Sequence, residues 1–458
     1  TAREKIAGRL LLIDEQFREV LPLVFDFLGV PDPERPAPRM DPEARQRRLV
    51  AVVRRLVERD NPNGFVILIE DLHWADAASD AFFGEWVDAI AGGPGLLLLN
   101  FRPEYRADWM KKPWYQQLPL DSLSPEAIRE LLGDLLGSHA SLEGLADRIH
   151  ARTRGNPYFT EEIVRALVES GALEGKRSGY RLTRPIDTLE VPETVQSVLA
   201  ARIDRLPERE KQVLQTAAVI GKEFAEPVLA AVANLTERDL AAALAALCDA
   251  GFLHEESLYP VAAYAFAHPL TQEVALGSQL QDRRRRRHAS VARAIENLHA
   301  QRLDEKAALL AHHFEEAAEP LEAARWHARA AAWLGTRDID ETLRHWQRVR
   351  ELVRALPETD ETSELHLLAC ARTLSTGGFR LGLSPETVEE LYEEGRALAE
   401  RSGNAQMLLS LRGAYGAWLF SLGRVREALE QTAETVRLAD AVGLAETRAS
   451  ARVGAAYC

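Results

Sequence analysis

The chain has 458 residues, too many for one hydrophobic core, so its length indicates about three domains. Hydrophobic residues make up 46% and charged residues 28%, as in soluble globular proteins, and we expect a cytoplasmic location. A formal net charge of −14 argues against nucleic-acid binding as the main role, and no apolar run approaches the ~20 residues of a membrane span. Cys248, Cys370 and Cys458 show neither metal-ligand spacing nor a disulfide pattern, which fits a reducing cytosol.

The first sixty residues are predicted to be helical. Apolar residues at helical spacing run over 6–28, a breaker-rich linker covers 31–38, and a charged amphipathic helix covers 41–59.

A strand predicted over 65–69 carries the first candidate site. These residues read Phe-Val-Ile-Leu-Ile, which predicts a strand buried on both faces of a parallel sheet, followed by Glu70, Asp71 and a His-Trp-Ala-Asp tail. Open α/β sheets bind ligands at the carboxyl ends of their strands. In a P-loop NTPase one such acid holds Mg²⁺ and its neighbour polarises or deprotonates the attacking water. The alternative is a buried strand that merely ends in acids.

A helix over 77–91, a Gly-rich turn and a second strand over 96–99 complete a βαβ unit. Arg102 follows this second strand and can therefore point into the same crevice as the acids. A guanidinium there could contact the γ-phosphate in bidentate fashion, although a solvated loop arginine is the alternative. Residues 118–120 could form a short third strand.

The chain contains no phosphate-binding loop of the P-loop type. Its Gly-Lys pairs are Gly175-Lys176 and Gly221-Lys222, and neither has the preceding Gly or the following Ser/Thr. We interpret the chain as a fragment whose phosphate loop lies upstream. We therefore expect weak nucleotide binding at best and no efficient ATP hydrolysis, because the backbone cradle and its lysine are missing.

Two or three helices are predicted over 124–170, starting with Ser124 as N-cap and Pro125 at the first helical position. Within them Gly155 and Pro157 frame a rigid Gly-x-Pro turn, which could wall an adenine but is by itself a routine helix start. Residues 171–190 are predicted to form a hairpin or loop.

Helices predicted over 194–206, 208–219 and 237–250, followed by strands over 251–254 and 264–266, indicate a winged helix. His268, after the second strand, could donate to a diphosphate, although a lone histidine there is more often structural. The basic run 283–287 points all round a helix, and we interpret it as the solvated start of that helix.

Beyond residue 290 the chain is Ala-rich, and its pattern indicates helix-pair repeats of an α-solenoid. Residues 397–403 recur in similar form at 437–443, and we expect the array to be truncated at residue 458. Small or apolar residues occupy positions where repeat helices approach closely. They are Ala311, Phe314, Ala323 and Ala330 in one unit and Gly416, Gly423 and Ala428 in another.

Together these motifs resemble the STAND class of signal-transducing P-loop NTPases. More narrowly, they resemble the ATPase–tetratricopeptide module attached to bacterial class III adenylate/guanylate cyclases. The most specific stretches are 69–76, 155–162, 191–196, 201–207, 217–221 and 264–274. The resemblance implies a mixed, mostly α fold. Its parts are a partial α/β P-loop NTPase core at 1–120, a helical lid at 121–190, a winged helix at 191–290 and tetratricopeptide-like repeats at 291–458.

The resemblance also implies ATP or ADP and Mg²⁺ as cofactors and assigns a role to six residues. Glu70 and Asp71 correspond to the metal-binding and catalytic acids, Arg102 to the sensor arginine, Gly155 and Pro157 to the adenine-side turn, and His268 to the histidine that contacts ADP. Many relatives carry Asp at the position of Glu70, which leaves open which acid binds the metal.

The implied function is a switch that regulates an attached effector, with a nucleotide cyclase expected. With ADP the winged helix packs on the NTPase core, and ATP releases it together with the repeats. The nucleotide can shift this equilibrium only by the difference in its affinity for the two states. Slow hydrolysis resets the switch, a protein or small ligand binds the concave face of the repeats, and the ATP state could form an oligomer. The alternatives are a LuxR-type transcription activator with a DNA-binding domain beyond residue 458, and a degenerate ATPase that acts as a repeat scaffold.

Overall fold

The computed structural model describes residues 2–38, 40–60, 64–91, 93, 95–189, 192–257, 261–335, 337–380 and 383–442. The described residues are mostly helical, as predicted. The chain forms two compact units, Thr1–Asp121 and Ser122–Cys458, and each is considered by itself. Among the described residues no helix is both long and apolar enough to cross a membrane. Residues 92, 94, 191, 443 and 458, which belong to predicted motifs, lie outside the described ranges.

The helices of the first unit are α1 (Ala2–Ile13), α2 (Leu21–Phe27), α3 (Pro42–Asp60) and α4 (Ala77–Ile90). The amphipathic helix predicted over 41–59 is confirmed as α3, but the apolar run over 6–28 is not one helix. Asp14 interrupts it, because its side chain accepts a hydrogen bond from the backbone N of Gln16 at 3.0 Å and starts the 3-10 turn Glu15–Glu19. The same carboxylate accepts a bond from Nε of Arg55 on α3 at 2.9 Å, so the break ties the N-terminal helices to α3.

Strands β1 (Phe65–Ile69) and β2 (Gly95–Leu99) pair in parallel over their whole length. With α4 between them they confirm the predicted βαβ unit. The prediction that β1 is buried on both faces is wrong for the described residues, because Val66 is 67% and Leu68 56% exposed. The opposite face packs against the aromatic side chains of α4 and the loop after β2. The apolar side chains on the uncovered face are Val66, Leu68, Leu96 and Leu98.

The third strand predicted over 118–120 is absent from the described part of this unit. Residues 116–121 are irregular, and Leu118 and Leu120 are almost fully exposed. A strand needs a neighbour for its hydrogen bonds, and the described sheet of this unit consists of β1 and β2 alone. Pro119 also lacks a backbone donor.

The second unit begins with a first helical segment (residues 122–189). It contains α5 (Pro125–Leu136), α6 (Leu145–Thr153) and α7 (Pro157–Glu169), followed by a hairpin of β3 (Leu173–Glu174) and β4 (Arg181–Leu182). The predicted cap is confirmed, since Oγ of Ser124 accepts a bond from the backbone N of Ala127 at 3.2 Å. Ile128, Ile149 and Ile163 of the three helices form one core, which also includes Val198 of the next helix.

A helix–sheet segment (residues 192–280) follows. Its helices are α8 (Val195–Arg205), α9 (Glu208–Ile220), α10 (Glu226–Ala233), α11 (Glu237–Asp249) and α12 (Pro269–Gly277). Its strands are β5 (Glu223–Ala225), β6 (Leu253–Ser257) and β7 (Ala263–Phe266), antiparallel in the order β5–β7–β6. The three predicted helices and two predicted strands are confirmed. The sequence reasoning missed α10, α12 and β5 because segments of three to nine residues are too short to show a period.

A buried ion cluster joins these two segments. Arg202 on α8 pairs with Glu162 on α7, and the side chains are only 1% and 2% exposed. Arg202 also donates from Nε to Glu169 at 2.8 Å and from Nη2 to the carbonyl of Ala250 at 2.7 Å. Its guanidinium carbon lies 4.5 Å from the centroid of the Phe252 ring. One side chain therefore connects α7, α8 and the turn between α11 and β6.

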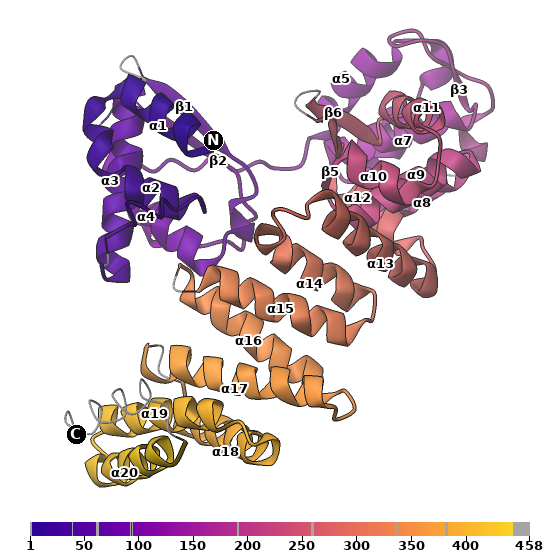
Figure 1. The fold of residues 1–458 in the computed structure, drawn as a ribbon. Helices are drawn as coiled ribbons and strands as arrows, with labels where there is room; N and C mark the ends of the chain where they lie inside the picture. The colour runs from indigo at the N-terminus through magenta and orange to yellow at the C-terminus, as the bar shows by residue number, and fades with distance from the viewer. Residues whose placement is uncertain are drawn as a thin grey trace. The chain divides into compact units, whose positions relative to one another are not determined.

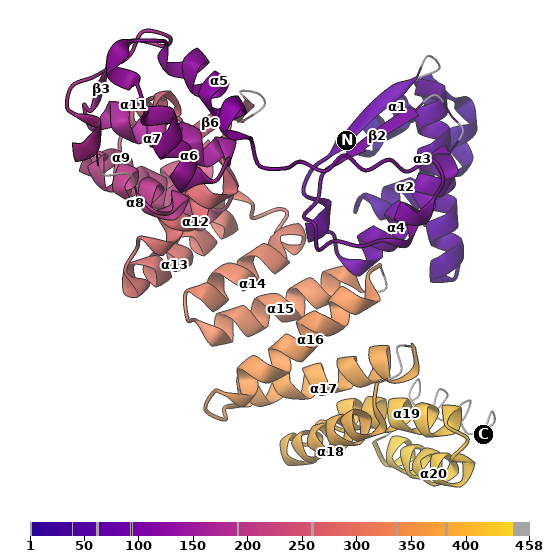
Figure 2. The same cartoon turned by 180° about the vertical axis from the view of Figure 1, so that it is seen from behind.

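The described residues beyond 280 form the helices α13 (Gln281–Leu298), α14 (Ala307–Glu316), α15 (Pro320–Leu334), α16 (Ile339–Arg354), α17 (Asp360–Arg380), α18 (Pro385–Ser402), α19 (Ala405–Ser421) and α20 (Val425–Val442). Helices α14 to α17 stack in chain order, as both views show (Figures 1 and 2). The predicted core residues Ala311, Phe314, Ala323 and Ala330 are confirmed as buried. They share a core with Val219 and Val228, so the repeats continue directly from the helix–sheet segment. The basic run 283–287 lies in the first half of α13, as predicted, but it is not solvated throughout, because Arg287 is half-buried and donates from Nη1 to Oε1 of Gln215 at 3.2 Å.

Not every small residue of the repeats serves close packing. Gly423 has φ 75° in the turn after α19, and no atom lies within 4 Å of the position its Cβ would take, so its role is conformational. A close helix contact is found instead at Gly395, which the prediction overlooked. A Cβ there would lie 2.9 Å from Cδ1 of Leu411 and 3.1 Å from Cβ of Cys370.

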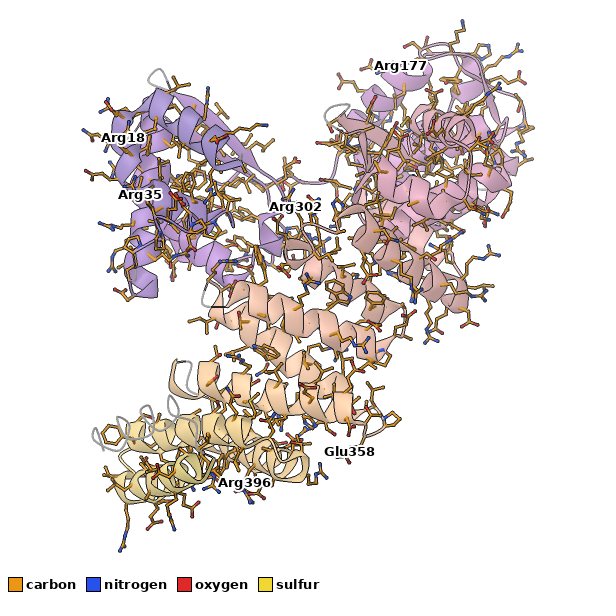
Figure 3. The ribbon with its side chains drawn as sticks, viewed as in Figure 1. Arg18, Arg35, Arg177, Arg302, Glu358 and Arg396 are labelled. Atoms are coloured by element: carbon orange, nitrogen blue, oxygen red, sulfur yellow. The ribbon has the colours of Figure 1, made fainter. Side chains whose placement is uncertain are left out.

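Exposed arginines of the repeats pair with acids one turn away. Arg302, after α13, donates to Glu305 at 2.8 Å, and Arg396 on α18 donates to Glu400 at 3.0 Å; both arginines are labelled in Figure 3. Such pairs contribute only a few tenths of a kcal/mol each, so the described repeats depend mainly on their buried residues.

Two buried histidine pairs lie between successive repeat helices. Nδ1 of His288 on α13 lies 3.0 Å from Nδ1 of His313 on α14, and Nδ1 of His327 on α15 lies 2.7 Å from Nδ1 of His345 on α16. Burial lowers the pKa of all four imidazoles. Together with the neighbouring charge of His312, burial lowers the pKa of His288 to about 4 and that of His313 to about 3. The rings of His288 and His313 are therefore neutral in the folded protein at neutral pH.

We predict that acid loosens the contact between α13 and α14. The unfolded chain takes up protons at these histidines below about pH 6.5, whereas the folded protein excludes them until about pH 4. The free energy of unfolding is therefore constant above about pH 6.5. It decreases as the pH is lowered below this value, by about 1.4 kcal/mol per pH unit for each histidine. Hydrogen–deuterium exchange of peptides from α13 and α14, corrected for the intrinsic rate at each pH, measures this loss.

The double variant His288→Leu/His313→Leu should flatten the pH dependence, because both partners become apolar and neither titrates. A His254→Gln variant is the control, since that histidine is exposed on β6. An unchanged slope in the double variant would contradict the assignment.

We predict that Arg202→Ala destabilises α7 and α8 by about 3 kcal/mol, because the buried carboxylate of Glu162 loses the ion pair with Arg202 and retains as a partner Arg165, whose side chain is 42% exposed. Arg205→Ala, in the same helix but exposed, should cost less than about 0.5 kcal/mol. Faster amide exchange in α7 and α8 of the first variant only is the expected result. Equal effects of the two substitutions would contradict it.

Candidate functional site

The acids after β1 and the polar residues after β2 meet at one edge of the parallel pair. We call Glu70, Asp71, Asn100 and Arg102 the strand edge. Asn100 connects its two sides: its Nδ2 donates to Oε1 of Glu70 at 3.3 Å, and its Oδ1 accepts from the backbone N of Asp71 at 2.5 Å. The backbone supports this geometry, because the N of Leu72 donates to the carbonyl of Asn100 at 3.0 Å. The carboxyl ends of the two strands thus lie together, as the βαβ pattern predicted.

Asp71 adopts a backbone conformation that is uncommon for residues other than glycine. Its φ of 54° and ψ of 37° place it in the left-handed region, immediately before the 3-10 turn Leu72–Trp74. Leu72 is buried, whereas the carboxylates of Glu70 and Asp71 are exposed. The turn therefore anchors the chain through Leu72 and leaves both acids accessible from solvent.

Arg102 is exposed and approaches the His-Trp-Ala-Asp tail. Its guanidinium carbon lies 5.8 Å from the centroid of the exposed Trp74 ring. A cation–π contact of this kind contributes about 0.5–1 kcal/mol at an exposed position. The structure thus brings Arg102 next to Trp74, within the turn that follows the two acids.

Two other residues of the tail have structural contacts. Oδ1 of Asp76 accepts a hydrogen bond from the backbone N of Ser79 at 2.7 Å and caps α4. His73 is largely buried, and its Nδ1 lies 3.9 Å from Oδ1 of Asp71. Both ring nitrogens lack a hydrogen-bond partner among the described residues.

The Gly-x-Pro turn before α7 is explained by local geometry. Gly155 has φ 80°, and a Cβ there would lie 2.2 Å from the carbonyl O of Leu123. The N of Leu123 donates to the carbonyl of Gly155 at 2.9 Å, so the two backbones are in direct contact. Asn156 caps α7 through the backbone N of Phe159 at 2.9 Å, and Pro157 occupies the first helical turn. These contacts are sufficient to account for the motif.

Tyr158 brings this turn together with His268. The two rings stack with centroids 3.9 Å apart and planes inclined by 13°. The phenol oxygen lies 3.1 Å from Oγ1 of Thr271, and Nδ1 of His268 accepts a bond from the backbone N of Leu270 at 3.1 Å. An imidazole that accepts at Nδ1 carries its hydrogen on Nε2 when neutral. Burial raises the pKa of Tyr158, so its hydroxyl remains protonated.

The six predicted residues fall into two groups. Glu70, Asp71 and Arg102 belong to the first unit, and the other three belong to the second. The sequence reasoning missed Asn100 and Tyr158 as site residues. An amide directly after a strand and an aromatic ring directly after the Gly-x-Pro turn were the available signals.

A second cluster contains metal-type ligands. His366, Cys370 and Glu394 bring one ligand atom each within 4.8 Å of one another, which the scattered cysteines of the sequence did not predict. The carboxylate of Glu394, however, accepts bonds from Nε of Arg350 at 2.7 Å and Nε of Arg354 at 2.8 Å. Burial alone would raise the pKa of Glu394, but His366 and the two arginines hold it well below its usual value. We interpret the cluster as an ion-pair network between α16, α17 and α18.

We predict that Gly155→Ala is far more destabilising than Gly171→Ala. Both glycines have positive φ, so both substitutions cost about 1 kcal/mol of backbone strain. Only at position 155 does the new methyl meet a backbone oxygen, whereas nothing lies within 4 Å at position 171. Thermal unfolding of the two variants should separate them by several degrees, and equal shifts would contradict the close contact with Leu123.

The chain is similar to other proteins over most of its length. No family model matches the chain. The uncharacterized protein R02095 of Rhizobium meliloti (strain 1021) is 27% identical over 401 residues, which are 86% of this chain but only 38% of that protein. A solved STAND protein with a tetratricopeptide repeat sensor, from Pyrococcus horikoshii, aligns with 89% of this chain and 67% of its own, at 10% identity and a TM-score of 0.38. A TM-score of this size does not assign the chain to the same fold.

Proposed function

We propose that the chain is part of a signal-transduction switch of the STAND type, which binds ATP or ADP with Mg²⁺ and regulates an attached effector. The observation that supports it best is the strand edge, where two parallel strands bring Glu70 and Asp71 together with Asn100. Nucleotide-binding α/β sheets place their ligands at this edge.

The donor set of the strand edge suits Mg²⁺. Carboxylate oxygens are ligands that this cation prefers, and both acids are exposed, so bound water can complete an octahedral shell. Glu70 and Asp71 would hold the ion, while the amide of Asn100 orients Glu70. The ion would supply charge neutralisation for the phosphates. Arg102 is the proposed sensor of the γ-phosphate.

The phosphate cradle is not among the residues of this chain. Gly175-Lys176 lies in the turn between β3 and β4, and Gly221-Lys222 lies between α9 and β5, so neither joins a strand to a following helix. We propose that further strands outside residues 1–458 complete the sheet and bring the phosphate loop. The uncovered apolar face of β1 and β2 supports a further helical layer there as well, because helices normally cover both faces of a parallel sheet.

In the same proposal the second unit responds to the bound nucleotide. The helix–sheet segment is a winged helix, Gly155 and Pro157 border the adenine, and His268 donates from Nε2 to the diphosphate. Helices α13 to α20 act as tetratricopeptide-like repeats that receive a protein or small ligand. The attached effector is a nucleotide cyclase. The stack of Tyr158 on His268, which joins the Gly-x-Pro turn to this histidine, supports the roles proposed for Gly155, Pro157 and His268.

The test uses the polypeptide extended by its natural upstream sequence. We predict Mg²⁺-dependent binding of ADP and ATP in calorimetry. The variant Glu70→Gln/Asp71→Asn should lose about tenfold or more of the Mg²⁺-dependent affinity, since both charged ligands are removed. Asp88→Asn on α4, whose partner is Lys112, is the matched control.

No nucleotide binding by the extended protein would contradict the proposal. Binding that is unchanged in the double variant would show that the acids are not the metal ligands and would favour a degenerate ATPase that serves as a scaffold.

A further inference from the structure

Tyr158 contacts α12 both by ring stacking on His268 and by a hydrogen bond, which is more specific than hydrophobic packing requires. His268 is the N-cap of α12, with φ −150° and ψ 140°, and Thr271 lies in the first turn of the same helix. Tyr158 therefore touches α12 at two points, with its ring on the imidazole and its hydroxyl on Thr271. The hydroxyl contact fixes the phenol ring relative to α12, and the stacked phenol ring limits tilting of the imidazole away from the cap, where its Nδ1 accepts from the backbone N of Leu270.

The tyrosine is itself held in place by a rigid element. It lies four residues before Glu162 on α7, on the same face of the helix, and Glu162 is paired with Arg202 in the buried cluster. Thr271 is buried as well. The packing of α7 on α8 thus positions the phenol ring, and the phenol ring covers one face of the imidazole at the cap of α12.

We propose that Tyr158 is a positioning residue for His268: it keeps the imidazole in the cap of α12 with Nδ1 accepting and Nε2 carrying the hydrogen that an anionic ligand would receive. The link to nucleotide binding rests on the function proposed above. The control of ring orientation and tautomer by Tyr158 does not, and it can be measured without a ligand.

Nitrogen-15 NMR of the chain labelled at histidine gives the direct readout, because the two ring nitrogens have different shifts when only one is protonated. A His268→Gln variant identifies the signals. We expect the wild-type protein and Tyr158→Phe, which keeps the stacked ring, to show one tautomer with hydrogen on Nε2. Tyr158→Ala should show an average of the two tautomers.

The matched control is Tyr180→Ala, which removes a tyrosine that packs on the core of the first helical segment. It should lower stability without changing the His268 signals. An unchanged His268 tautomer in Tyr158→Ala would overturn the proposal. A mixed tautomer in both alanine variants would show a general loss of structure and would also overturn it.

A double-mutant cycle in the extended protein tests the link to the nucleotide. Tyr158→Ala and His268→Ala should each weaken ADP binding about tenfold, and the double variant should be no weaker than either single variant, because both remove the same interaction. Additive losses would overturn a role of Tyr158 through His268. If His268→Ala leaves ADP affinity unchanged, the proposed role of His268 fails, while the tautomer experiment still decides whether Tyr158 positions the ring.

Discussion

The second unit depends on the requirement that a buried charge must be paired. The guanidinium of Arg202 is enclosed by Glu162, Glu169 and the carbonyl of Ala250, with the Phe252 ring against its face. An arginine cannot lose its charge at any accessible pH, so these groups have to remain around it. That requirement determines how α7 packs on α8, and it thereby determines where the residues at the start of α7 lie.

The sequence alone predicted features that depend on neighbouring residues. The bounds of β1, the cap at Ser124 and the helix over 41–59 follow from local propensity, and the meeting of Glu70 with the end of β2 follows from the connection rule for parallel strands. The connection rule brings the strand ends together but does not show which side chains touch, so it did not identify the contact of Asn100 with Glu70, and the partner of Tyr158 lies 110 residues away. The burial of β1 was predicted wrongly, because an apolar run shows what a strand can bury but not how many layers cover it.

The strand edge and the Gly-x-Pro turn differ in how much of their geometry the described residues explain. At the Gly-x-Pro turn every feature has a structural cause, from the contact of Gly155 with Leu123 to the cap by Asn156. At the strand edge, the exposed carboxylates of Glu70 and Asp71 and the left-handed backbone of Asp71 contribute little to stability. Strained, accessible polar groups of this kind accumulate where a protein binds a ligand.

The shared cores restrict how the second unit can move. The first helical segment shares a core with α8, and the helix–sheet segment shares one with α13 to α15. Parting α7 from α8 would open the Arg202 cluster, and at about 3 kcal/mol this state would be populated by less than about one molecule in a hundred. It would be a local unfolding event and not a hinge movement. A ligand that displaces the first repeat helices would therefore move Tyr158 and His268 together with these helices as one rigid body. No flexible connection between the segments would absorb the displacement.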